Sequence, residues 1–222
     1  GQKANIALTV DALTDHYTHN YRYEVLGCRL LKVWAYRKTA ADAVDAASVR
    51  DITAEVEHVT ADSGLCEIVL SGDKAGEDRF VCAAIAFAFL YPDVHSDEAL
   101  HFERELISKH RRINAAGFIK DEWGFPPSYT WAAEKNEYWF SPAMARRYAM
   151  ISGGRDLADD CFLMYRSQTG KVEERRQAID RMNRMNQARL LEFEQQVYEL
   201  SKKYWGEYAF VGTHPTWYPY PG

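Results

Sequence analysis

The chain has 222 residues, a formal net charge of −5 and a hydrophobic fraction of 47%. That length is enough for one large domain or two small ones. No segment gathers lysine and arginine into the basic stripe that contacts nucleic-acid phosphates, so we expect no nucleic-acid partner. No apolar run is long enough to span a membrane, and no signal peptide is visible. The missing signal peptide does not decide the location, for which we favour the periplasm or secretion.

The first part of the chain predicts a small antiparallel β module. Strand-like runs occupy residues 6 to 10, 30 to 36 and 65 to 70, and a turn signal at residues 62 to 64 precedes the last of them. No helix of ordinary length is evident before residue 90. We therefore place one domain at residues 1–78 and a second at residues 79–222.

The four cysteines do not form a zinc-binding pattern. Cys28, Cys66, Cys82 and Cys161 include no CxxC pair, and none belongs to a His/Cys cluster with zinc spacing. The first three lie in strand-like runs, where they could be buried thiols. A disulfide among these three is also open, and the spacing does not choose a pair.

The second domain begins with a strand, a helix and another strand. Residues 81–90 are apolar throughout and run into a Pro-containing loop. Ser96 then precedes two acidic residues, which is a typical helix start. Residues 115–119 form a second, shorter apolar run that leads into the charged residues 120–122, and it is typical of a buried strand. This order predicts a βαβ unit with two parallel strands.

Three helices and a last strand are predicted after an aromatic loop that contains Tyr129. Ser141-Pro142 is a typical helix start, a second helix ends near residue 165, and residues 171–205 predict a long, charged helix. The last apolar run, residues 208–212, leads into a loop with His214 and Trp217. Both late strands thus end in polar and aromatic residues at a proline turn.

Asp121 and Glu122 lie where the buried strand breaks into a loop that contains Trp123, a glycine and two prolines. In α/β folds, ligands bind at the carboxyl ends of the strands. A carboxylate beside an aromatic ring suits general acid catalysis on a sugar, because the apolar ring raises the pKa of the acid. The alternative is that Asp121 caps the turn and Glu122 forms a surface ion pair.

The run from Gly117 to Gly124 resembles the fourth barrel strand of bacterial glycoside hydrolases, and it is most similar to family 106, the α-L-rhamnosidase-like enzymes. Flanking segments are similar to that family in the same order, and they cover residues 52–70, 91–102 and 140–163. The likeness extends over roughly residues 48–218. It implies an α/β fold, in which a partial TIM-type (β/α) barrel follows the antiparallel β module.

The resemblance also implies roles for individual residues. Glu122 would be the proton donor, and Asp121 would orient it or a metal ion. The resemblance implies that His214 faces the sugar. The aromatic residues Trp123, Tyr129 and Trp217 are further expected sugar contacts, because their rings could stack on the sugar. No cofactor is certain, and the clustered acids leave a calcium ion open.

The sequence departs from the family pattern in three ways. Trp123 replaces a proline, and Thr213 replaces the glycine of a Gly-His pair. The chain also holds only about three strands of an eight-stranded barrel, so the strand that would supply the second carboxylate is missing. We therefore interpret the chain as a piece of a larger enzyme or as a divergent relative, with the rest of a longer chain or a second copy as partner.

The expected function is hydrolysis of glycosidic bonds in a carbohydrate substrate, as in polysaccharide degradation. One alternative is a non-catalytic carbohydrate-binding protein that uses the same aromatic residues. Another is a structural or interaction module, in which the aromatic residues belong to the core and the long helix is a docking surface.

Overall fold

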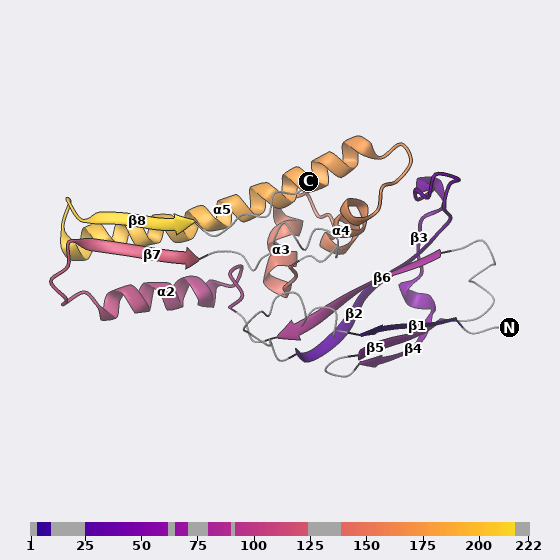
Figure 1. The fold of residues 1–222 in the computed structure, drawn as a ribbon, viewed down its shortest axis with the longest axis horizontal. Coiled ribbons are helices and arrows are strands. Elements are labelled where there is room, and N and C mark those ends of the chain that lie inside the picture. Colours follow the sequence, from indigo (N-terminus) through magenta and orange to yellow (C-terminus); the bar gives the residue numbers. More distant parts are fainter. Residues whose placement is uncertain are drawn as a thin grey trace. The chain divides into compact units, whose positions relative to one another are not determined.

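The computed structural model of the chain describes residues 4–9, 25–61, 65–70, 80–89, 92–123 and 139–215. The chain divides into two compact units. Unit 1 comprises residues 1–91 and 158–178, and unit 2 comprises residues 92–157 and 179–222. Figure 1 shows the elements of both units.

Unit 1 contains two three-stranded antiparallel sheets (Figure 1). The first has the order β1-β5-β4, with β1 (Ala4–Thr9), β5 (Leu65–Leu70) and β4 (Val56–Ala61). The second has the order β3-β2-β6, with β3 (Arg50–Asp51), β2 (Val25–Tyr36) and β6 (Phe80–Phe89). Two short 3-10 helices, η1 (Ala46–Ser48) and η2 (Thr53–Glu55), flank β3.

The β3-β2-β6 sheet packs on both of its faces. One face meets the other sheet in a cluster that includes Val33 of β2 and Ile68 of β5, both fully buried. The opposite face meets helix α4 (Leu157–Tyr165), where the rings of Trp34 and Phe162 stack with centroids 4.7 Å apart. Alternation along β2 therefore sends apolar side chains to two separate clusters.

The expected βαβ unit is wrong, because the strand at residues 80–89 has a different partner. β6 pairs antiparallel with β2 along most of its length and does not pair with the strand at residues 117–123. Its uniformly apolar sequence has a physical reason all the same. Side chains of β6 contribute to the clusters on both faces of the sheet, so both faces need apolar residues.

Unit 2 combines helices with one short parallel sheet (Figure 1). Its elements are α2 (Asp97–Lys109), β7 (Gly117–Trp123), α3 (Pro142–Ile151), most of α5 (Val172–Trp205) and β8 (Phe210–Pro215). β7 and β8 are parallel, and the helices α3, α4 and α5 lie between them in sequence. The strands are close enough that a Cβ on Gly117 would lie 1.9 Å from the carbonyl oxygen of Phe210, so glycine is required there.

Two predicted helix starts are confirmed. The Ser96 side chain accepts a hydrogen bond from the amide of Ala99 at the start of α2, at 3.2 Å. Ser141 does the same for Met144 at the start of α3, at 3.0 Å, and Pro142 takes the first turn. Among the described helices, none combines the length and the hydropathy that a membrane span requires.

The predicted partial TIM-type barrel is also wrong. Apart from the β7–β8 pair, the strands of the described residues pair antiparallel in two small sheets. No barrel-like arrangement of alternating strands and helices is present in this part of the chain. The fold is α+β, because the long apolar strand that was expected to extend a parallel sheet is used in an antiparallel one.

Candidate functional site

The carboxyl ends of β7 and β8 bring together residues that the sequence singled out separately. The two strands are in parallel register, with Lys120 opposite Thr213 and Trp123 opposite Pro215. Between these two pairs the register shifts, so Asp121 and Glu122 lie opposite a single residue, His214. Two residues facing one is the arrangement of a β-bulge, which is rare between parallel strands.

The bulge is a feature of the main chain, since it is defined by the register of the two strands. For Asp121, Glu122, Trp123 and His214 the description covers the main chain alone, whereas Tyr129 and Trp217 lie outside the described residues. The main chain brings four of the six predicted site residues to one end of a two-stranded sheet. The sequence order alone did not reveal that these two strands are neighbours.

Lys120, the residue before the acidic pair, anchors β7 to two helices. Its side chain is 7% exposed, and its ammonium lies 3.3 Å from Glu103 of α2 and 2.8 Å from Glu194 of α5. Gln196 of α5 also donates a hydrogen bond of 3.0 Å to Glu103. Burial raises the pKa of Glu103, and the charge of Lys120 opposes this effect. The ammonium thus fixes β7 one residue before the bulge.

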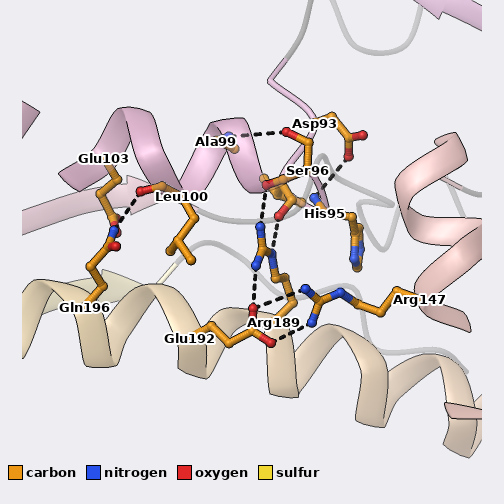
Figure 2. Close-up of polar contacts among 11 residues, drawn as sticks. Asp93, His95, Ser96, Ala99, Leu100, Glu103, Arg147, Arg189, Glu192 and Gln196 are labelled. Atoms are coloured by element: carbon orange, nitrogen blue, oxygen red, sulfur yellow. Dashed lines mark hydrogen bonds and ion pairs between the residues drawn. The ribbon is translucent and has the colours of Figure 1, made fainter. Parts of the chain in front are cut away.

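A second buried network holds the loop that leads into α2 (Figure 2). Arg189 of α5, which is fully buried, donates hydrogen bonds to the carbonyl oxygens of Val94, at 2.6 Å, and of Ser96. It also pairs with Glu192, which receives two hydrogen bonds from Arg147 of α3, at 2.6 and 3.2 Å. The network therefore joins α3, α5 and the loop before α2.

The electrostatics of this network keep Glu192 ionised. Burial alone would raise its pKa, but the hydrogen bonds from Arg147 and Arg189 outweigh that effect and lower the pKa. Two guanidinium groups thus share one carboxylate, and two backbone carbonyls accept hydrogen bonds from Nε and Nη2 of Arg189. Because Arg189 bonds both the Glu192 carboxylate and two loop carbonyls, this arrangement holds the loop in place.

His95 lies in the loop that Arg189 holds (Figure 2). It is 3% exposed, and burial lowers its pKa to about 4, while Asp93 acts in the opposite direction. The charges of Arg147 and Arg189 lower the pKa further. The imidazole is therefore neutral at pH 7. Sequence reasoning missed His95, although it lies, like the acidic pair, in a segment that leaves a strand.

A cleft among the described residues of unit 2 lies elsewhere. It has a volume of about 340 Å³ and is lined by residues of α2 and α5, among them Arg104, Ser108 and Tyr204. Trp205, next to Tyr204, donates a hydrogen bond to the carbonyl oxygen of Ile113. Because Ile113 precedes β7, this cleft lies near the amino end of that strand. It does not coincide with the bulge at the carboxyl end.

The described residues contain no group of three or more His, Cys, Asp or Glu side chains that could hold a metal ion. Comparisons with known proteins add no relative: no family model, no curated protein and no solved structure matched the chain. The site is therefore interpreted from the residue types at the carboxyl ends of β7 and β8 and from the register of these two strands.

Proposed function

We propose that the chain is a glycoside hydrolase, or a part of one, in which Glu122 donates a proton at the carboxyl ends of β7 and β8. The supporting observation is the register that sets Asp121 and Glu122 opposite His214 in a bulge. Bulges recur beside active sites, where they redirect side chains, and ligands bind at the carboxyl ends of parallel strands. The likeness of residues 117–124 to a catalytic strand of family 106 points the same way.

The chemistry assigns each residue one task. Glu122 protonates the glycosidic oxygen as the bond to the anomeric carbon breaks. The charge of the adjacent Asp121 and the apolar indole of Trp123 are the kinds of neighbour that keep such a carboxyl protonated near neutral pH. His214 hydrogen-bonds a sugar hydroxyl, and Trp123 offers a ring face to the sugar. Tyr129 and Trp217 remain predicted sugar contacts.

The test is Glu122→Gln in the full polypeptide that the source encodes, assayed with a panel of aryl glycosides. We expect kcat/KM to fall by roughly 10²- to 10⁴-fold, which is the usual contribution of a general acid. The loss should be largest for aglycones that are poor leaving groups, because these need protonation most. Glu105→Gln is the matched control, since the Glu105 carboxylate lies on α2 with its side chain 54% exposed.

Two results would change the assignment. If Glu122→Gln turns over every substrate at the rate of the unaltered protein, Glu122 is not the acid. If the protein binds oligosaccharides without hydrolysing them, and Trp123→Ala abolishes the binding, it is a carbohydrate-binding protein that uses the same strand ends without catalysis.

A further inference from the structure

Two cysteines of unit 1 come from different sheets and meet in one core cluster. Cys66 of β5 is fully buried, and Cys28 of β2 is half-buried and packs against the same cluster. The Cys28 side chain is near enough to the Cys66 thiol to raise its pKa, both by its charge and through a side-chain hydrogen bond. Sulfur atoms at hydrogen-bond distance need only a small movement to become bonded.

The remaining cysteines do not share this position. Cys82 of β6 packs in the cluster on the opposite face of the β3-β2-β6 sheet, with Trp34 and Phe162. Cys161 belongs to α4, which also lies on that face. The sheet therefore separates these two thiols from Cys66, and the structure selects one pair from the several that the sequence left open.

We propose that Cys28 and Cys66 are a thiol oxidation site, at which a small-molecule disulfide converts the pair into a disulfide between the two sheets of unit 1. This inference is independent of the proposed function. Packed β-sheets are known to accept such a bond, since immunoglobulin domains carry a disulfide between their two sheets.

The reaction proceeds by two thiol–disulfide exchanges. The Cys28 thiolate attacks one sulfur of the oxidant, forms a mixed disulfide and releases the first small thiol. Cys66 then loses its proton to solvent and attacks the sulfur of Cys28, which releases the second small thiol. Two protein thiols are oxidised by two electrons, and one small disulfide is reduced to two thiols.

The order of the two attacks follows from exposure. Burial and the neighbouring Cys28 raise the pKa of the Cys66 thiol to about 11, so its thiolate is scarce at neutral pH. Cys28 is the more exposed of the two, and it meets the oxidant first. The second exchange should therefore limit the rate, and oxidation should accelerate as pH rises from 7 to 9.

The experiment incubates the whole chain with oxidised glutathione at pH 8, blocks the remaining thiols by alkylation and maps the peptides by mass spectrometry without reduction. We expect a cross-linked peptide that joins Cys28 to Cys66, with Cys82 and Cys161 alkylated. We also expect Tm to rise by about 5–10 °C, because the bond constrains the unfolded chain.

Four serine variants complete the test. Cys28→Ser and Cys66→Ser should lose both the cross-link and the rise in Tm, whereas Cys82→Ser and Cys161→Ser should keep both. Alkylation of both Cys28 and Cys66 after oxidation of the unaltered chain, or a cross-link to another cysteine, would overturn the proposal. The map of the unaltered chain gives this answer even if a serine variant does not fold.

Discussion

The two units differ in what they bury. Among the described residues of unit 1, the buried side chains are mostly apolar, and Asp160 is the charged exception. Unit 2 instead buries an arginine, a lysine, a glutamate and a histidine, which are Arg189, Lys120, Glu103 and His95. One unit is thus held mainly by the hydrophobic effect, and the other depends in addition on buried ion pairs and hydrogen bonds.

This difference has a physical consequence. Apolar burial is non-directional. Truncating a buried apolar side chain therefore lowers the free energy of unfolding by an amount set by the apolar area that is lost and the cavity that is left. A buried charge is tolerated only while its partners are in place, so the loss of one partner exposes the full desolvation penalty of the others. Unit 2 should therefore be more sensitive than unit 1 to single polar substitutions and to acid.

The largest effect is expected from Arg189→Met. The change leaves the carbonyl oxygens of Val94 and Ser96 without their donor and removes one of the two guanidinium groups on Glu192. We expect a loss of about 4 kcal/mol in the free energy of unfolding of unit 2. Hydrogen exchange in peptides of α2 and α5 would measure it.

Arg184→Met is the matched control, because the Arg184 side chain lies on the same helix, is 75% exposed and pairs with Asp180. It should cost no more than about 0.5 kcal/mol. Equal losses in the two variants would show that the buried network around Arg189 contributes nothing beyond an exposed ion pair.

Acid should weaken unit 2 through His95. Its pKa is about 4 in the folded chain against 6.5 for an ordinary histidine, so the unfolded state takes up the proton first as pH falls. The contribution to stability is complete above pH 6.5 and is lost between pH 6.5 and 4, at most on the order of 3 kcal/mol. Denaturant unfolding measured between pH 7 and 4.5 would detect most of this loss while avoiding much of the carboxylate titration.

His95→Asn should remove this acid sensitivity, since asparagine does not titrate. The control is His101→Asn on α2, because the His101 side chain is 66% exposed. The free energy of unfolding of this variant should fall in acid as it does for the unaltered chain. If the His95 variant loses stability between pH 6.5 and 4.5 as steeply as the unaltered chain, another group is responsible.

Local signals in the sequence predicted the helices well. Ser96 and Ser141-Pro142 start α2 and α3 as expected, because a cap depends on residues within one turn. The predicted helix at residues 171–205 corresponds to α5 (Val172–Trp205). The pairing of β6 could not be predicted in the same way, because an apolar run shows that both faces are buried but not which strand lies beside it.

The buried charges were missed for a related reason. A charged residue on a long helix is usually solvated, yet Arg189 lies four residues from both Met185 and Phe193, which are buried. That i, i+4 spacing placed Arg189 on the apolar face and was the available signal. Its partners Val94 and Ser96 are 95 and 93 residues away, so no local pattern could identify them.

The smallest effect is expected in unit 1. Ile68→Val removes one methylene from a fully buried side chain of β5, which should cost about 1 kcal/mol, read from hydrogen exchange in peptides of β2 and β5. Because nothing in this change titrates, the cost should be the same at pH 7 and pH 5. Ile119→Val on β7, where the side chain is 65% exposed, should cost much less. A cost at Ile68 that grows in acid would mean that the stability of unit 1 also depends on charge, and the contrast between the two units would fail.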